Sequence, residues 1–328
     1  MNKHFYLFFL VLLAPSILVA NIAQASEPGI SNSAPNVVVS IKPIHSLVSA
    51  VMKGIGQPLL MIQGHETPHN FKLSPGKAKS LSQADIFFWI GEELESLLNK
   101  PIKSLIHHAK VISLIKTPGL SIYPFRKQWH HIDLHDNDDL HNNKDKHLKE
   151  HDHSHTSSDP HIWLDPLNAI KLVEDIRDNL ITIDNKNILQ YKTNAQNLIA
   201  SLQQLHNDLR HKTKHIMNKP FLVFHDSYQY FEKRYQLTAT GSIIFNPESS
   251  SSAKRLRDIQ TLIKNKNIVC IFSEPQFSPK LVKTVIRGSQ VKTGLLDPIG
   301  VNLEAGDNLY FTLLNNLYKD LNQCLTSS

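Results

Sequence analysis

Residues 186–217 read KNILQYKTNAQNLIASLQQLHNDLRHKTKHIM and form one long periodic segment in the middle of the chain. Its apolar residues recur by threes and fours, which is typical of an amphipathic helix. They are Leu189, Ala195, Leu198, Ile199, Leu202, Leu205 and Leu209. The helix is predicted to end before Pro220, because proline cannot continue a helix. A helix of ~30 residues would be ~45 Å long, enough to traverse a whole domain.

On both sides of this helix, short apolar runs alternate with helical stretches. The predicted strands are residues 37–41, 59–62, 86–90, 111–114, 221–224, 242–245, 268–272 and 291–296. The predicted helices are residues 43–53, 77–83, 92–98, 166–183, 228–234, 253–263, 279–287 and 309–321. Such alternation indicates parallel sheets with helices on both faces. We therefore predict an α/β protein of two lobes, 36–185 and 220–328, joined by one long linker helix over 186–217.

The N-terminus has the parts of a secretory signal. Lys3 is positive, residues 5–20 are apolar, and Ala23-Gln24-Ala25 places small residues at a cleavage site. We expect residues 1–25 to be a signal peptide and the mature chain to be periplasmic. The alternative, a single anchoring helix, is disfavoured because the apolar segment is short. No cysteine lies near the cut, so no lipid anchor is expected.

The composition excludes several classes of protein. With 41% hydrophobic and 20% charged residues, the 328-residue chain is that of an ordinary folded protein. Only the N-terminal segment is apolar enough to cross a bilayer, which excludes a polytopic membrane protein. The net charge is +6, but the basic residues are scattered and lack interleaved aromatics, so no nucleic acid is expected as a partner.

Histidine is unusually frequent, at 19 residues, and eight of them lie between residues 126 and 159. This segment has almost nothing to bury, so we expect a disordered insertion in the first lobe. Five Lys/Arg against eight Asp/Glu give it a charge of −3. Imidazoles near carboxylates make a weak, secondary site for divalent metals. The eight are His130, His131, His135, His141, His147, His151, His153 and His155.

Other chemistry-bearing residues follow the apolar runs singly. His69 follows the run 59–62, His161 follows the insertion, His225 ends the strand 221–224, and Asp297 ends 291–296. Ligands bind at the carboxyl ends of strands in doubly wound folds, so these four side chains are candidates to meet in the cleft between the lobes. Taken singly, a histidine after a strand is more often a packed or surface residue, and Asp297 before a proline could simply start a turn.

Five segments carry a resemblance to a known family. They are TPHNFKLSP (67–75), HIWLDP (161–166), FHDSY (224–228), SEPQF (273–277) and LDPIG (296–300). In this order, over nearly all of the chain after the signal, they resemble the ZnuA-type periplasmic zinc-binding proteins of bacterial zinc ABC importers. The resemblance implies two lobes bridged by one rigid helix. It also implies zinc as the transported ligand, held by His69, His161, His225 and Asp297.

The ligand types bear on the choice of metal. Three neutral imidazoles and one carboxylate suit tetrahedral Zn²⁺. Manganese-binding proteins similar to this layout have a glutamate at the third position, where His225 favours zinc because Mn²⁺ prefers harder oxygen donors. The chain departs from gut-bacterial family members at Pro68, where they carry a glutamate, and Glu66 is offset from that position.

Two other functions compete with zinc capture for a membrane permease. An exported zinc-dependent hydrolase would use three ligands and a water. Against it, His65-Glu66-Thr67-Pro68-His69 has the His-Glu-x-x-His spacing but contains Pro68 and lies in a predicted loop rather than a helix, and Glu66 and Glu274 are the only candidate bases. A manganese-type adhesin would need the missing glutamate and a lipid-anchor cysteine. We therefore expect a zinc-binding protein that is not an enzyme. We also expect it to be a monomer.

Cys270 and Cys324 are the only cysteines in the chain. Export would place them where disulfides persist, so we predict that they are joined. Cys270 lies in a predicted strand and Cys324 at the end of the last helix, and the bond would fix that helix to its lobe. The alternative is two unpaired thiols.

Overall fold

Two parallel sheets of four strands each form the framework. The computed structural model describes residues 1, 34–126, 158–244, 247 and 252–327. The strand orders β2-β1-β3-β4 and β6-β5-β7-β8 give the two sheets the same topology. The strands are β1 (Val37–Val39), β2 (Leu59–Leu60), β3 (Ile86–Trp89), β4 (Lys110–Ser113), β5 (Phe221–Val223), β6 (Ala239–Ser242), β7 (Cys270–Ser273) and β8 (Lys292–Leu295). The predicted class, two α/β lobes, is confirmed.

Helices cover the sheets, which explains the strand sequences. The central strands β1 and β3 are buried throughout and read VVV and IFFW. Strands covered on both faces are continuous apolar runs rather than alternating ones. The helices of the lobes are α1 (Lys42–Val51), α2 (Pro75–Ser82), α3 (Asn99–Leu105), α4 (Pro166–Ile183), α6 (Gln229–Tyr235), α7 (Ala253–Asn265), α8 (Lys280–Val285) and α9 (Leu309–Thr326). Within the described ranges, no helix is both long enough and apolar enough to cross a membrane.

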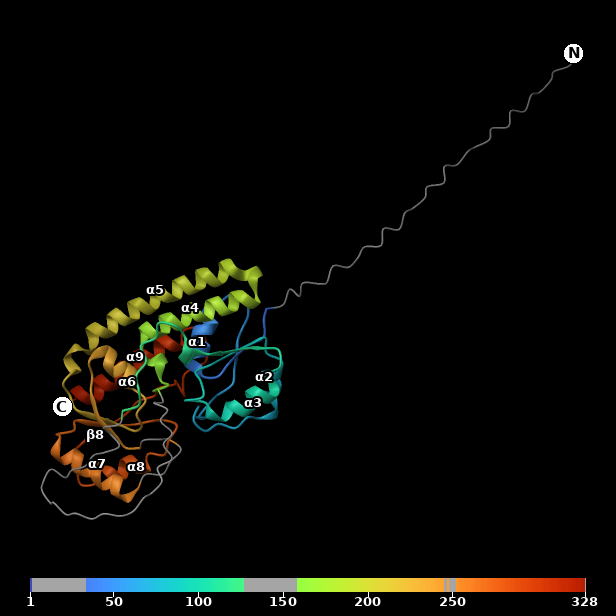
Figure 1. Ribbon diagram of the computed structural model, residues 1–328. Coiled ribbons are helices and arrows are strands. Elements are labelled where there is room, and N and C mark those ends of the chain that lie inside the picture. The colour runs from blue at the N-terminus through green and yellow to red at the C-terminus, as the bar shows by residue number, and fades with distance from the viewer. Residues whose placement is uncertain (2–33, 127–157, 245–246, 248–251, 328) are drawn as a thin grey trace, which may run out of the picture. The chain divides into compact units, whose positions relative to one another are not determined.

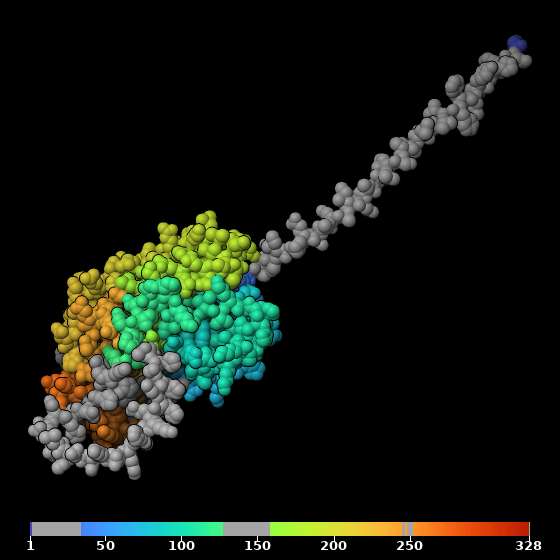
Figure 2. Space-filling model, in the orientation of Figure 1, coloured from blue at the N-terminus to red at the C-terminus, as the bar shows by residue number. Residues whose placement is uncertain are grey.

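The long helix α5 (Ile188–Lys212) joins the lobes and runs beside α4 (Figure 1). Its 25 residues correspond to about 37 Å. Short 3₁₀ turns, Asn185–Asn187 and Thr213–Ile216, flank it. Its buried side chains include Tyr191, Ala195, Leu198, Leu202, Leu205 and Leu209, a repeat of four and three that forms one apolar stripe. In Figure 2 the yellow-green and gold surface of α4 and α5 borders both the green-cyan first lobe and the orange second lobe.

One apolar core runs through both lobes. It includes Phe87 of the first sheet, Phe272 of the second, and Leu313 of α9. Polar contacts add to this connection, since Lys42 at the start of α1 donates through Nζ to the backbone oxygens of Gly300, Val301 and Leu303 at 2.7–3.0 Å. The disulfide between Cys270 and Cys324 fixes α9 to β7, as predicted. The two lobes therefore share a packed boundary rather than touching only at the linker.

Two predicted elements lie elsewhere. The helix expected over 92–98 is a 3₁₀ turn at Ser96–Leu98 followed by α3, because the buried Glu95 carboxylate accepts the backbone N–H of Ile90 and Gly91 and holds the chain in a turn. The strand expected over 242–245 is β6, which ends at Ser242. The apolar residues Ile243 and Ile244 that suggested it follow the end of the strand and are buried in a smaller apolar cluster of the second lobe, with Leu222 and Ile271.

Glu95 makes a testable contribution to pH-dependent stability. Burial raises its pKa to about 7 from 4.5, so the folded chain keeps the proton after the unfolded chain has lost it. This carboxyl therefore destabilises the fold progressively between about pH 4.5 and pH 7, by about 3 kcal/mol at completion. The free energy of unfolding of Glu95→Gln should therefore rise by that amount relative to the parent between pH 4.5 and pH 8. Urea unfolding of zinc-free protein measures it. The exposed Glu92→Gln is the control, and equal pH profiles for the parent and Glu95→Gln would contradict the assignment.

Candidate metal centre

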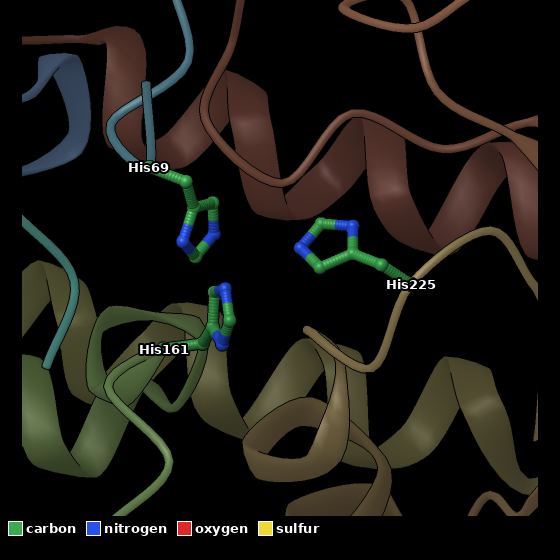
Figure 3. Close-up of side chains that lie close together, drawn as sticks. All are labelled: His69, His161 and His225. Carbon is green, nitrogen blue, oxygen red and sulfur yellow. The ribbon is translucent and has the colours of Figure 1, made fainter. Parts of the chain in front are cut away.

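Three imidazoles from distant parts of the chain converge between the lobes (Figure 3). The ring centroids of His69, His161 and His225 lie 5.4–5.8 Å apart. One nitrogen of each ring can be chosen so that all three lie within 4.8 Å of one another. A tetrahedral Zn²⁺ with ~2.0–2.1 Å bonds needs nitrogens ~3.3 Å apart, so an approach of at most ~1.5 Å would complete three bonds. The donor set therefore fits zinc.

His69 comes from the loop between β2 and α2. A tight turn shapes this loop, in which Asn70 N–H donates to the Thr67 carbonyl and His69 N–H donates to Thr67 Oγ1. Burial lowers the pKa of His69 well below its ordinary value, with further lowering by the imidazoles of His225 and His161. Its ring is consequently neutral at neutral pH, which is the form that binds metal.

His161 and His225 are each oriented by a buried carboxylate. Nδ1 of His161 lies 2.7 Å from Asp159 Oδ1, and Nδ1 of His225 lies 2.7 Å from Glu274 Oε1. A neutral imidazole that donates from Nδ1 to a carboxylate presents the lone pair of Nε2. In His225 this Nε2 is buried and has no hydrogen-bond partner among the described residues. A buried nitrogen without a partner is costly in a folded protein unless a ligand serves it.

The turn that carries His161 is held by the second lobe. Its Ile162–Leu164 segment is a 3₁₀ turn, where Trp163 Nε1 donates to the Pro298 carbonyl and the Trp163 carbonyl accepts from Tyr310 Oη. The adjacent Asp165 carboxylate is paired with Arg234 of α6 at 2.6 Å. The turn of His161, which belongs to the first lobe by sequence, is therefore also tied to the lobe that carries His225.

Asp297 does not join this group of ligand atoms. It follows β8, as expected, but its Oδ1 accepts from Ile299 and Gly300 N–H and its Oδ2 from Val301 N–H, at 2.6–3.1 Å. Burial raises its pKa, and these backbone bonds counteract the rise. Its role as fourth ligand stays a prediction. Glu66 is also outside the group and pairs with Lys77 at 2.5 Å.

Both described ends of the insertion lie beside the centre. Pro124 and Ser158 form an antiparallel bridge, and Asp159 N–H donates to the Tyr123 carbonyl. Arg126 lies between the carboxylates of Asp226 and Glu232. All eight insertion histidines lie outside the described residues, so their weak metal site stays a prediction.

Sequence reasoning missed three contributors to the centre. Asp159 is expected only as the end of the insertion and Glu274 only as a candidate base, whereas in the structure both orient imidazoles. Gln276 lines the small cavity at the histidines. The role of Asp159 could be found from its spacing. A carboxylate two residues before a candidate histidine ligand can accept a hydrogen bond from the ring of that histidine.

Replacing Asp159 tests the orienting carboxylates. Asp159→Asn removes the negative charge that faces the Nδ1–H of His161 and leaves an amide in its place. Loss of such support typically lowers metal affinity 10–100-fold, so we expect a decrease of roughly tenfold or more in competition titrations with zinc. The exposed Asp178→Asn on α4 is the matched control. Equal zinc affinities for the parent and Asp159→Asn would show that Asp159 does not support the ligand.

Two parallel-sheet lobes joined by a long helix, with three imidazoles converging between them, define a two-lobed metal-binding receptor. The family described as zinc-uptake complex component A, periplasmic (ZnuA), matches residues 37–324. The chain belongs to this family.

Comparisons with individual proteins also place the chain in this family. The chain is 44% identical over 306 residues to the high-affinity zinc uptake system protein ZnuA of Brucella suis biovar 1, covering 88% of this chain and 91% of that protein. A crystal structure of ZnuA superposes with a TM-score of 0.73 at 22% identity. The periplasmic zinc-binding protein TroA from Treponema pallidum does so with a TM-score of 0.73 at 18% identity. Both alignments cover 90% of this chain and 100% of the other, and they show the shared fold.

Proposed function

We propose that this protein captures Zn²⁺ through His69, His161 and His225 and delivers it to the membrane permease of an ABC importer. The observation that carries the proposal is the buried Nε2 of His225, which has no partner in the part of the chain that the structure describes and faces two further imidazoles while its Nδ1 is held by Glu274. A metal ion satisfies this nitrogen and draws the other two rings together. The names of the relatives, high-affinity zinc uptake system proteins, support the same metal and the same process.

The compartment and partner are parts of this proposal. The signal-like residues 1–25 and the family description support an exported, periplasmic protein. We propose that it acts as a monomer and is not an enzyme. Oε1 of Glu274 is already engaged by His225, so this candidate base is used to orient a ligand.

Zinc binding and delivery can be tested separately. Calorimetry on residues 26–328 should show one tight Zn²⁺ site that survives a competing chelator. The chain should also restore growth under zinc limitation in a strain that retains the cognate permease but lacks this gene. Absence of tight zinc binding would overturn capture. Tight binding without restored growth would overturn delivery, and turnover of ester or peptide substrates would favour the hydrolase.

Deleting residues 130–155 tests the predicted secondary site. We expect the deletion variant to bind fewer zinc ions in total but to keep the one tight site, because His69, His161 and His225 remain. Flexible ligands must be ordered when they bind, so the additional ions should be weaker. They should also be released on mild acidification, since imidazoles with a pKa near ~6.5 must be neutral to bind. Loss of the tight site in calorimetry would show instead that the insertion supplies a primary ligand.

A further inference from the structure

The four-residue turn Glu274-Pro275-Gln276-Phe277 brings a further polar group to the metal centre. The Phe277 N–H donates to the Glu274 carbonyl at 3.2 Å, which closes a β-turn with proline at its favoured second position. The Phe277 ring stacks on Phe224 at 4.9 Å and meets the His225 ring edge-on at 5.9 Å. The Phe277 ring thus packs the end of the turn against Phe224 and His225, and Gln276 at the third position of the turn lines the cavity of the three histidines.

Within that cavity, Gln276 presents an acceptor that nothing in the described chain serves. Its Oε1 is buried and has no hydrogen-bond partner within residues 34–126, 158–244, 247 and 252–327. The first residue of the same turn, Glu274, already holds Nδ1 of His225 through Oε1. An amide oxygen cannot donate, and this one belongs to a residue that lines the same cavity as the three imidazoles. The group that satisfies it must therefore carry an O–H or N–H.

The ligands present at the centre indicate the identity of the donor that satisfies Gln276 Oε1. Among the described residues, the group of converging ligand atoms has three members, all imidazoles. Tetrahedral zinc needs a fourth donor, and a water molecule supplies both an oxygen for the metal and a proton for an acceptor. Asp297 has both carboxylate oxygens engaged by backbone N–H groups, and Glu66 is paired with Lys77.

We propose that Gln276 is a positioning residue whose Oε1 accepts a hydrogen bond from a water bound to the fourth coordination position of the captured metal. This inference rests on the proposed zinc site. Gln276 does not touch the ion itself and acts through the water. A hydrogen bond to a metal-polarised O–H is of the charge-assisted type, so its loss should be measurable.

Cobalt(II) and azide provide the test, because Zn²⁺ is d¹⁰ and has no visible spectrum, whereas Co²⁺ bands report the coordination sphere. Azide has no proton to donate, so the Gln276 acceptor should disfavour azide relative to water. In the Co²⁺ protein, Gln276→Leu should change the visible bands and tighten azide binding roughly tenfold, while weakening zinc by a similar factor. Gln276→Glu keeps an acceptor and should restore the resistance to azide. Gln203→Leu, on the exposed face of α5, is the control.

The outcomes separate this proposal from the proposed function. If the parent chain binds neither Zn²⁺ nor Co²⁺ tightly, the metal site itself is wrong. If the parent binds both ions and Gln276→Leu has the parental spectrum and azide affinity, the role of Gln276 is wrong. Weaker azide binding in Gln276→Leu would mean that the amide N–H₂ faces the ligand. Bands that respond to Asp297→Asn but not to Gln276→Leu would assign the fourth position to the carboxylate.

Discussion

The His225→Ala protein is expected to bind zinc at least roughly 100-fold more weakly than its parent, because removing a ligand should exceed the 10–100-fold cost of removing the group that supports one. The substitution deletes the only imidazole contributed by the strand end of β5 and leaves two converging rings, His69 and His161. It also leaves Oε1 of Glu274 buried without the ring nitrogen that it accepts from. Both consequences weaken a centre that depends on three donors.

Competition calorimetry of the parent, His225→Ala and His225→Gln would measure this loss. Glutamine keeps most of the side-chain volume, so comparison with alanine separates the missing ligand from the cavity that alanine leaves. His211→Ala, at an exposed position near the end of α5, controls for removing a histidine that is not a ligand. Thermal unfolding without zinc should show that the fold survives. Parental zinc affinity in both His225 variants would disprove the assignment of His225 as a ligand.

The three histidines of the centre are candidates from the sequence because they follow apolar runs or the insertion, and the resemblance to the ZnuA-type family selects them as a set. His225 comes directly after the apolar run Phe221–Phe224, and parallel strands present their carboxyl ends at one edge of a sheet. The three-four repeat likewise predicts α5. The exception is Leu189, which is 79% exposed, while Tyr191 is buried and donates from its hydroxyl to Asp184. Counting apolar residues favours Leu189 as the buried position. A tyrosine such as Tyr191 can occupy the same buried stripe when its hydroxyl is hydrogen-bonded.

The remaining parts of the centre depend on tertiary packing that no short pattern contains. Glu274 acts on His225 from 49 residues away, because β5 and β7 are neighbours in the second sheet. Asp159 holds His161 only because the ends of the insertion are fastened to α6, where Gln229 donates to its second oxygen. For Asp297, the position after β8 could be predicted, but the backbone N–H groups that its oxygens accept could not.

Removing the disulfide should cost the fold about 4 kcal/mol, the value that the chain-entropy model gives for a loop closed by cysteines 54 residues apart. Cys270 is fully buried in β7 and Cys324 is nearly so on α9, the helix whose other end contacts α1 across the lobe boundary. The bond therefore restrains the unfolded chain over most of the second lobe and fixes α9 in the folded one. We expect the Cys270→Ser, Cys324→Ser double variant to melt roughly 10 °C lower, at about 2–4 °C per kcal/mol for a chain of this size.

The zinc ligands should be unaffected by this change, which separates a structural bond from a functional one. None of His69, His161 and His225 lies on β7 or α9, so the double variant should still bind one zinc tightly below its melting temperature. Reduction of the parent with dithiothreitol should lower its melting temperature by a similar amount and leave the double variant unchanged. Thermal scans of zinc-free protein provide the comparison, because bound metal would itself stabilise the native state. Two free thiols in the exported parent, or a melting temperature that neither reduction nor substitution lowers, would show that the pair does not contribute as a disulfide.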